Sequence, residues 1–545
     1  MSKAVSIRVE PEHGERVELH ATPGTRVLSE VLAAQGFPLN TRCGQRGLCR
    51  GCEIILKDGS LMVGTAEISA PATVRSCRAK LHGPVTIAIP TRSRIEHKPQ
   101  VGETFEIAVP YAHDPLFPAG AVRDTAFAVD IGTTTVVVLL ADLVSGQVLA
   151  RAGGFNGQIR FGDNVLTRID AARTPETIAA MQAAVVSETL APLLLQACER
   201  AGRDPSRIAG GTIAGNTTML HLLTGEDPTS LGIAPFTARF LSGKRLSAAD
   251  IHLAVEGLAP ETPIQLLPGI AAYIGADITA GVYASGMVFD AKPSLLVDIG
   301  TNGEIVLQCN GSLTATATAA GPAFEGCGLR CGTRAREGAV SDLAITATPF
   351  EITAQTIGGI PLSRASGICG SAYIDFLASA RRSGLLGHAG RFDSTLWDKL
   401  PEAFRSTEDG ERALLLTGDA SPGSPRVSEV DVAVLLQAKA AIGAGIETLL
   451  ETAGIKAEKI SRVYLAGGFG MHLNVSNAIA IGLLPGFKPE QVRVVGNTSL
   501  AGALLALIDR TTLEEMEALR EKVDIIELNL AEDFEDRYIE HLMLT

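Results

Sequence analysis

The chain has 545 residues, of which 46% are hydrophobic, 20% charged and 4% aromatic. This is the composition of a folded globular protein, which excludes a disordered or fibrous chain. Lys and Arg total 47 against 60 Asp and Glu, giving a formal charge of −13, and the absence of any long basic block argues against a nucleic-acid partner. At roughly 100 to 200 residues per domain, the length predicts two to four domains.

The sequence predicts no membrane span, because each long apolar stretch is interrupted before it reaches the roughly 18 to 20 residues that cross a bilayer. The interrupting residues are Asp130, Asp277, Gln437 and Lys439. The N-terminus alternates as a strand and carries early acids, unlike a signal peptide. We therefore expect a cytoplasmic protein, in which nine sparse cysteines do not form a disulfide framework.

Four of these cysteines lie near the N-terminus, at Cys43, Cys49, Cys52 and Cys77, with the spacing C-x5-C-x2-C-x24-C. The first three lie on a glycine-rich loop, and glycine permits the backbone conformations that wrap a small inorganic cluster. The surrounding pattern of two strands, a helix and further strands predicts a β-grasp domain over residues 1–90. These observations favour a 2Fe-2S cluster over zinc, because structural zinc prefers two tight C-x2-4-C pairs and the sequence has one.

Five arginines accompany these cysteines: Arg42, Arg46, Arg50, Arg75 and Arg78. Positive charge beside a cysteine favours the thiolate form, which is the form that binds metal. The arginines therefore agree with an anionic iron-sulfur cluster held by thiolates.

Residues 91–124 carry four prolines and little periodicity, which predicts a semi-rigid linker. After it comes an internal repeat. The segment D-I-G-T occurs at 130–133 and again at 298–301, each time between an apolar strand and a returning strand. The turn of such a hairpin presents backbone N–H groups and hydroxyls to phosphate oxygens, and the acid can hold Mg2+ through water.

The same order of strands and helices follows each hairpin, which predicts two ATPase lobes, 125–292 and 293–545, each a mixed sheet with packed helices. Asp130 and Asp298 are the candidate catalytic residues, which would position Mg2+ or the attacking water. The alternative is that each carboxylate caps a tight turn. The candidate ATP contacts are Gly132, Thr133, Thr134, Thr135, Asn216, Thr217, Gly300, Thr301, Asn302, Gly303, Glu304, Gly467, Gly468 and Phe469.

Some of these contacts have a plainer interpretation. Glu304 could equally be a solvent-facing strand residue, and Asn216 a helix N-cap. Gly467 and Gly468 follow a predicted strand, where the missing side chains would let an adenosine lie against the backbone.

The two D-I-G-T hairpins and the L-A-G-G-F segment at 465–469 resemble the motifs of acetate and sugar kinases, heat-shock ATPases and actin. That likeness implies ATP binding and hinge closure. More narrowly, the N-terminal cysteines with the later motifs resemble the ATP-dependent reductive activators of corrinoid proteins over essentially the whole chain. The motifs are GNTTM (215–219), LPGIAAYIGAD (267–277), DIGTNGEI (298–305), GPAFEG (321–326), SGICGSAYID (366–375), QAKAAI (437–442) and AGGFG (466–470).

The resemblance implies an α/β multidomain protein: an N-terminal β-grasp 2Fe-2S ferredoxin domain followed by a duplicated actin-like (RNase H-like) ATPase. It implies an enzyme that uses ATP to reduce Co(II) in a corrinoid (cobalamin-binding) protein of a methyltransferase system to Co(I), passing the electron through a 2Fe-2S cluster. Cys43, Cys49, Cys52 and Cys77 would ligate that cluster, and ATP with Mg2+ would be the second cofactor. An external electron donor is expected, and a homodimer is left open.

Other functions of the same ATPase fold stay open at this point. The first is a small-molecule or sugar kinase, which leaves the cysteine cluster unexplained. The second is a nucleotide-gated binding module or chaperone with a structural cluster, and the third is an activator of acyl-CoA dehydratases, which holds a 4Fe-4S cluster between subunits.

Cys309, Cys327, Cys331 and Cys369 form a second group, spread over 61 residues. A single C-x3-C pair is a poor metal-ligand pattern, and cysteine is often simply buried. We therefore predict buried thiols rather than a second metal site.

Overall fold

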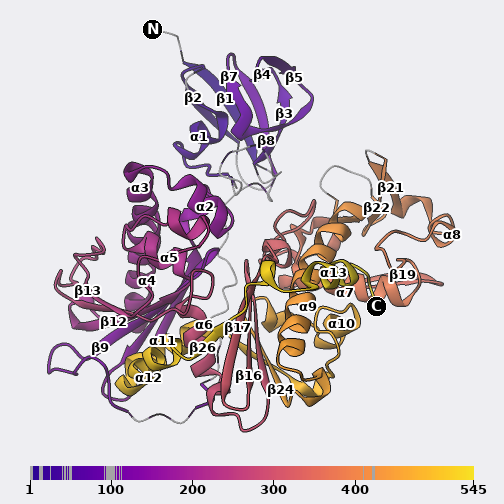
Figure 1. The fold of residues 1–545 in the computed structure, drawn as a ribbon. Helices are drawn as coiled ribbons and strands as arrows, with labels where there is room; N and C mark the ends of the chain where they lie inside the picture. Colours follow the sequence, from indigo (N-terminus) through magenta and orange to yellow (C-terminus); the bar gives the residue numbers. More distant parts are fainter. Residues whose placement is uncertain are drawn as a thin grey trace.

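The computed structural model describes residues 4–11, 16–24, 26–39, 41, 45, 47, 52–90, 93, 105, 107–109, 111, 113–408, 410–419 and 424–545. The fold has a small N-terminal domain and two larger lobes, and each lobe is built on its own six-stranded sheet (Figure 1).

The described residues of the N-terminal part form a mixed main sheet, a smaller sheet of β5, β4 and β7, and the helix α1. Its elements are β1 (Val5–Pro11), β2 (Val17–Ala21), α1 (Leu28–Ala33), β3 (Glu53–Asp58), β4 (Ser60–Val63), β5 (Ala66–Ser69), β6 (Ala72–Arg75), β7 (Ala79–Leu81) and β8 (Val85–Ile89). The main sheet has the order β2-β1-β8-β3-β6, with β1 parallel to β8. Alternating residues such as Ile7, Ile54 and Ile87 point inward and pack with Leu28 of α1 into a separate core.

The first lobe is built on six strands. Its elements are β9 (Thr125–Ile131), β10 (Thr135–Asp142), β11 (Val148–Phe155), α2 (Val165–Ala171), α3 (Pro175–Val185), α4 (Ala191–Ala201), β12 (Ile208–Gly215), α5 (Thr217–Leu223), β13 (Lys244–Ser247), β14 (Pro263–Leu266) and α6 (Ala276–Ala284). The strand order is β11-β10-β9-β12-β14-β13. β9 and β10 form the antiparallel hairpin of the first D-I-G-T segment, and β12 runs parallel to β9.

The second lobe repeats this order. Its elements are β15 (Ser294–Ile299), β16 (Gly303–Cys309), β17 (Ser312–Thr318), β18 (Ala339–Ala347), β19 (Phe350–Thr356), β20 (Gly367–Ile368), α7 (Gly370–Arg382), α8 (Ser394–Trp397), β21 (Arg405–Glu408), β22 (Glu411–Leu415), β23 (Arg426–Ser428), α9 (Glu429–Thr452), β24 (Arg462–Ala466), α10 (Val475–Ala480) and β25 (Val492–Gly496). The strand order of its sheet is β26-β17-β16-β15-β24-β25, in which β26 (Val523–Ile525) comes from the end of the chain. The repeat predicted from the two D-I-G-T segments therefore extends to both sheets.

The end of the chain passes between the lobes. It comprises α11 (Thr498–Ile508), α12 (Arg510–Arg520), β26 (Val523–Ile525) and α13 (Phe534–His541). Leu500, Leu504 and Leu507 of α11 are buried in the core of the first lobe, and Thr212 of β12 donates a hydrogen bond to the Ala503 carbonyl at 2.7 Å. The sequence predicted that 293–545 forms the second lobe alone. Packing instead assigns α11 to the first lobe, because this helix is apolar on all sides and needs a core to cover it.

α6 and α11 cross in close contact between the lobes. A Cβ on Gly502 would lie 2.4 Å from the Ala280 carbonyl oxygen, and one on Gly281 would lie 2.7 Å from the Thr498 hydroxyl. The two helices can therefore approach this closely because each has a glycine at the point of contact.

Several described residues of the predicted linker contact the two ends of α11. Phe105 forms a β-bridge with Gly496, just before the helix. At the other end, the backbone N–H groups of Asp114 and Leu116 donate to the carbonyls of Ile508 and Leu507. These described residues of the predicted linker are thus packed against the lobes.

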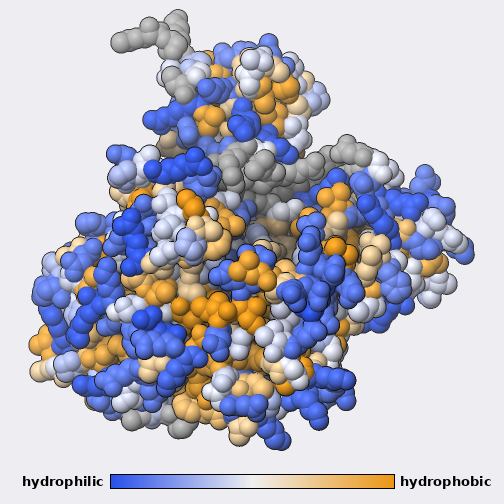
Figure 2. All heavy atoms as spheres, viewed as in Figure 1, coloured by the Kyte–Doolittle hydropathy of each residue, from blue (hydrophilic) through white to orange (hydrophobic). Residues whose placement is uncertain are grey.

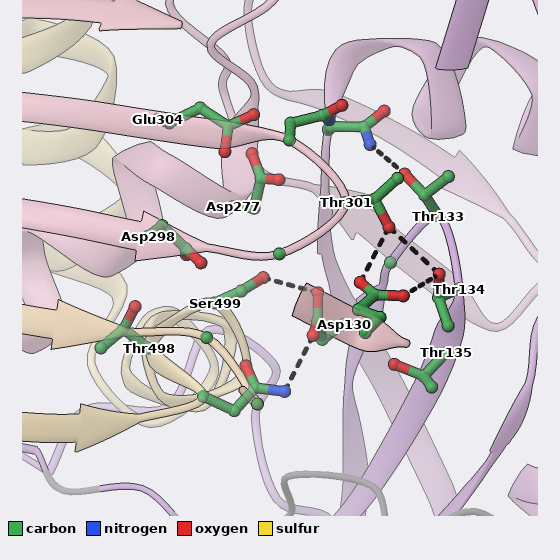
Figure 3. Close-up of a pocket in the computed structure, with 18 residues that line it drawn as sticks. Asp130, Thr133, Thr134, Thr135, Asp277, Asp298, Thr301, Glu304, Thr498 and Ser499 are labelled. Carbon is green, nitrogen blue, oxygen red and sulfur yellow. Dashed lines mark hydrogen bonds between the residues drawn. The ribbon is translucent and has the colours of Figure 1, made fainter. Parts of the chain in front are cut away.

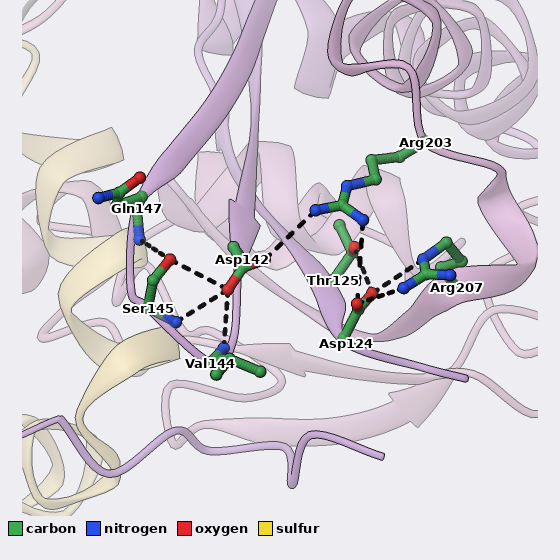
Figure 4. A network of polar contacts seen from close by, with 8 residues as sticks. All are labelled: Asp124, Thr125, Asp142, Val144, Ser145, Gln147, Arg203 and Arg207. Carbon is green, nitrogen blue, oxygen red and sulfur yellow. Dashed lines mark hydrogen bonds and ion pairs between the residues drawn. The ribbon is translucent and has the colours of Figure 1, made fainter. Parts of the chain in front are cut away.

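A polar network fixes the entry into the first lobe (Figure 4). Asp142 accepts hydrogen bonds from the backbone N–H of Ser145 at 2.8 Å, which closes the turn between β10 and β11. Asp124, just before β9, accepts from the Arg207 guanidinium, with Nε at 3.0 Å. Arg203 lies between the two carboxylates. Arg207 holds the pKa of Asp124 below its usual range, and the Ser145 backbone N–H does the same for Asp142.

Two helical stretches among the described residues, Pro175–Ala201 and Glu429–Thr452, are long and apolar enough to cross a membrane by length and composition alone. In their most apolar 18-residue segments, 56% and 78% of the residues are buried inside the protein. Core helices of this length and composition have the same apolar character. Figure 2 shows polar residues over most of the visible face, with apolar residues gathered near its centre.

Candidate functional site

A cavity of about 130 Å³ lies where the two D-I-G-T turns face each other. The ends of β12, β24 and β25 complete it (Figure 3). Its lining residues are Asp130, Gly132, Thr133, Thr134, Thr135, Asn216, Asp277, Asp298, Gly300, Thr301, Asn302, Glu304, Glu325, Gly467, Gly468, Asn497, Thr498 and Ser499. Most of these side chains carry hydroxyls, amides or carboxylates, which suits an ionic and strongly hydrogen-bonding ligand.

The turn of the first lobe is held in place from behind. Asn216 donates to the Thr133 hydroxyl at 2.9 Å, and Asn156 donates to the Gly132 carbonyl at 2.9 Å. Arg168 donates to the Thr133 carbonyl and is fully buried. Burial lowers the pKa of this guanidinium to about 9, so a positive group with neutral hydrogen-bond acceptors lies directly behind the turn. A bound anion would compensate this charge.

Asp130 is bonded by residues that begin α11. Asn497 donates to one carboxylate oxygen at 2.8 Å and Ser499 to the other at 2.7 Å. The carboxylate therefore links the first D-I-G-T turn to the helix that follows β25, whereas the turn-cap alternative requires bonds within its own turn. Burial raises the pKa of Asp130 above its usual value.

Four further carboxylates line the cavity with Asp130, and three of them, Asp277, Asp298 and Glu304, have raised pKa values. Burial, reinforced by Asp298 and Asp130, raises the pKa of Asp277 to about 8, and burial with the Asp130 charge raises that of Asp298 to about 7. The pKa of Glu304 is also raised, first by burial and then by Asp277 and Asp298. No Lys, Arg or His stands among the described residues that line the cavity.

This set of carboxylates fits a cation. A divalent ion would stabilise their charged forms, which burial otherwise disfavours. No group of three or more His, Cys, Asp or Glu side chains within the described ranges lies close enough to ligate a metal directly. The arrangement therefore suits Mg2+ that keeps much of its water shell, as Mg2+ on phosphates usually does.

Most of the predicted nucleotide contacts line this cavity. Glu304 is 5% exposed and points into the cavity (Figure 3), not to solvent. Three predicted contacts do not line it: Thr217, Gly303 and Phe469. The Thr217 hydroxyl donates to the Ala271 carbonyl at 2.7 Å, and Phe469 stacks on Phe324 with ring centroids 5.3 Å apart.

Five lining residues were not predicted: Asp277, Glu325, Asn497, Thr498 and Ser499. A sequence signal exists for three of them. The segment GNTSL at 496–500 repeats GNTTM at 215–219, and Asn216 and Asn497 both cap the helix that follows their strand. The internal repeat therefore extends to this second pair of turns.

The N-terminal cysteine loop is described in part. Cys52 and Cys77 are buried, and Ser76 brings them together, because its backbone N–H and its hydroxyl both donate to the Cys52 carbonyl, at 3.1 and 2.8 Å. Cys43 and Cys49 lie outside the described residues.

Two of the arginines near these cysteines, Arg75 and Arg78, lie against Gly47. Arg75 donates to the Gly47 carbonyl at 2.5 Å. Gly47 has a φ of +75°, and a Cβ at this position would lie 2.4 Å from Nε of Arg78. The tight glycine turn and the positive side chains against it fit an anionic cluster held by thiolates.

The second group of cysteines is mostly buried. Cys327, Cys331 and Cys369 are at most 9% exposed, whereas Cys309 is partly exposed. Burial raises the pKa of the Cys369 thiol to about 12, which keeps it protonated and unreactive.

Two matched sheets around a carboxylate-lined cavity, joined by crossing helices, define an ATPase of the acetate and sugar kinase, heat-shock protein and actin class. A family model described as the ASKHA domain, the C-terminal domain of RACo, matches residues 292–545. A second model, described as the RACo middle region, matches residues 125–290.

Similar proteins extend this likeness to the whole chain. The corrinoid activation enzyme RamQ of Eubacterium limosum is 30% identical over 579 residues, covering 95% of this chain and 96% of the relative. The [Co(II) methylated amine-specific corrinoid protein] reductase of Methanosarcina barkeri is 27% identical, covering 76% of this chain and 75% of the relative. A solved structure of a reductive activator for corrinoid, iron-sulfur protein is 30% identical with a TM-score of 0.72, covering 99% of this chain and 98% of that one. The chain belongs to the RACo family of reductive activators of corrinoid proteins.

Proposed function

We propose that this protein reduces the Co(II) form of a corrinoid protein to Co(I), in a reaction that depends on ATP and draws its electron through a 2Fe-2S cluster. The observation that carries the proposal is the likeness to a reductive activator over 99% of the chain. The substrate is the corrinoid of a separate protein, and an external donor supplies the electron.

The nucleotide part of the proposal rests on the cavity. Thr133, Thr134 and Thr301 offer hydroxyls from both lobes to phosphate oxygens. Asp130, with Asp298, lies at the strand ends, where carboxylates would hold hydrated Mg2+ and orient the attacking water. Gly467 and Gly468 leave room for the adenosine at the second lobe.

The redox part rests on the N-terminal domain. Cys52 and Cys77 are both buried, and Ser76, next to Cys77, donates to the Cys52 carbonyl. Cys43 and Cys49 would complete the set of ligands. The sheet order β2-β1-β8-β3-β6 with one packed helix supports a β-grasp ferredoxin. When bound, the cluster supplies a one-electron carrier.

ATP and an electron carrier belong together for an energetic reason. A plant-type 2Fe-2S cluster sits near about −400 mV, and each further 59 mV costs about 1.4 kcal/mol in a one-electron step. A nucleotide that shifts a conformational equilibrium from 1:99 to 99:1 supplies about 5.5 kcal/mol, which corresponds to about 240 mV. Closure of the lobes about the α6–α11 crossing is the transducer that we propose for this energy.

The test follows the cobalt spectrum of a corrinoid protein mixed with the reconstituted chain, a reductant and Mg-ATP. We expect Co(I) to accumulate only with nucleotide. Cys52→Ser should abolish cobalt reduction while nucleotide affinity is kept, and Cys309→Ser, in the second lobe, should retain both. Equal reduction without nucleotide, or an active Cys52→Ser variant, would contradict the proposal.

A further inference from the structure

Glu325 joins the two nucleotide turns to each other. The Thr134 hydroxyl donates to one oxygen of its carboxylate at 2.7 Å, and the Thr301 hydroxyl donates to the other at 2.9 Å. These bonds appear as dashed lines beside the labelled threonines in Figure 3. Each hydroxyl has one proton to donate. The two hydroxyls also lie 3.1 Å from each other, so in this arrangement Glu325 competes with a phosphate for their protons.

The surroundings of this carboxylate are those of an anion site. Nε of Arg334 lies 3.7 Å from the Glu325 carboxylate, which is too far for a hydrogen bond, and this buried N–H has no hydrogen-bond partner in the part of the chain that the structure describes. Buried Arg168 lies behind the Thr133 carbonyl. A phosphate has more oxygens than a carboxylate and could use the donor that Glu325 leaves unmet.

The four other carboxylates of the cavity have different neighbours from those of Glu325. Asp130, Asp277, Asp298 and Glu304 line the same cavity, and neighbouring carboxylates of this set add to the raised pKa values of Asp277, Asp298 and Glu304. Glu325 instead accepts hydrogen bonds from threonines and faces Arg334. The cavity thus has one region suited to a cation and another suited to an anion, as a metal-bound terminal phosphate requires.

We infer that Glu325 occupies the terminal-phosphate position of the nucleotide site in the free protein and must leave it before ATP is clamped. The inference rests on the proposed ATP-binding function and names a residue that regulates that site. Glu325 is a positioning residue, because it acts by holding Thr134 and Thr301 and by competing with the phosphate.

The Glu325 side chain can rotate while the backbone of its turn stays in place. The turn Pro322–Glu325 lies between Gly321 and Gly326, which have φ values of +71° and +75°. Its Phe324 carbonyl lies so close to Gly370 that a Cβ there would be 1.7 Å away. Phe324 also stacks on Phe469, beside the Gly467–Gly468 turn. The turn is therefore fixed to the adenosine side of the site, and rotation of the Glu325 side chain is enough to vacate the phosphate position.

This exchange predicts a difference between nucleotides. ATP has the terminal phosphate that competes with Glu325, and ADP has not. Removal of the Glu325 charge should therefore strengthen ATP binding selectively, whereas a merely structural loss would affect both nucleotides alike.

The test measures affinity by calorimetry on the full-length, cluster-loaded protein, with Mg2+ and either the β,γ-imido analogue of ATP or ADP. We expect Glu325→Gln and Glu325→Ala to bind the ATP analogue about tenfold more tightly and to bind ADP with unchanged affinity. Glu337→Gln is the matched control, because Glu337 lies in the same segment and is exposed; its affinities should equal those of the unaltered protein.

The outcomes separate the two proposals. If the unaltered protein and all variants bind neither nucleotide, the proposed function falls and this inference falls with it. If the unaltered protein binds nucleotide and the Glu325 variants keep its ATP to ADP ratio, or bind the ATP analogue more weakly, only the inference is overturned.

Discussion

Asp277 holds a proton at neutral pH in the metal-free protein, because burial and the neighbouring Asp298 and Asp130 raise its pKa to about 8. An unfolded Asp titrates near about 3.9. The folded state therefore binds a proton that the unfolded state releases between about pH 4 and 8. The stability that this proton contributes is present below pH 4 and is lost as the pH rises through 8.

Asp277→Asn should accordingly stabilise the nucleotide-free protein at pH 8.5 by on the order of 1 to 3 kcal/mol and leave it little changed at pH 4.5. The same variant should lose most Mg-ATP hydrolysis, since it lacks a carboxylate that faces the metal. Urea unfolding at the two pH values measures the first effect. Glu337→Gln is the control, and an Asp277→Asn protein with the pH profile of the unaltered chain would contradict the assignment.

At this scale the sequence predicts part of the site. Asp130 and Asp298 are predictable because each ends an apolar strand before a Gly-Thr turn, and the pattern occurs twice. Asp277 precedes no such turn: it lies in the first turn of α6, and only the packing of that helix brings it to the cavity. Glu325 is likewise placed by a glycine-flanked turn whose direction no periodicity predicts.

Among the elements, the crossing of α6 and α11 depends on Gly502. Gly502→Val should lower the free energy of unfolding by about 1 to 3 kcal/mol, because its Cβ would overlap the Ala280 backbone. It should also impair ATP-dependent cobalt reduction, since the two helices join the lobes. Thermal unfolding and the cobalt assay measure both effects. Gly83→Ala is the control, because a Cβ at Gly83 meets nothing within 4 Å; equal loss in both variants would contradict the role of the crossing.

The network at the start of the first lobe has its own acid dependence. Because Arg207 lowers the pKa of Asp124, the pair stabilises the fold above about pH 4, and this contribution is lost as the pH falls further. Arg207→Gln should lower the free energy of unfolding at pH 7 and leave it unchanged near pH 2, where Asp124 is protonated.

Arg173→Gln is a fitting comparison, since its side chain is 73% exposed and its partner Asp170 is 52% exposed. Water and salt screen such a pair, so its removal should leave stability unchanged at both pH values. A cost at Arg207 that persists at pH 2 would show that the pair does not act through the Asp124 charge.

At the scale of the whole molecule, the two lobes do not fold from separate stretches of chain. The first lobe needs Leu500, Leu504 and Leu507 from the end of the sequence. We expect residues 125–290 alone to give no cooperative thermal transition, whereas residues 105–545 should give one. Circular dichroism on both fragments tests this, and a cooperative transition of 125–290 would contradict it.

The packing of α11 in the first lobe also shows which part of the domain organisation the sequence does not predict. The strand order of both lobes is predictable from the repeated hairpins, because sequential strands tend to pair. The destination of α11 is not, because an all-apolar helix fits either core equally well, and only the short connection from β25 through Asn497 directs it across the boundary.

The path of the residues before the first lobe has a mechanical consequence. The eleven residues of α11 form a helix roughly 16 Å long. At its start, Asn497 and Ser499 donate hydrogen bonds to Asp130. At its end, the Ile508 carbonyl accepts a hydrogen bond from the Asp114 backbone N–H. Phe105 also forms a β-bridge with Gly496, just before this helix. A displacement of α11 that follows occupancy of the cavity would therefore also displace Phe105 and Asp114, which contact its two ends.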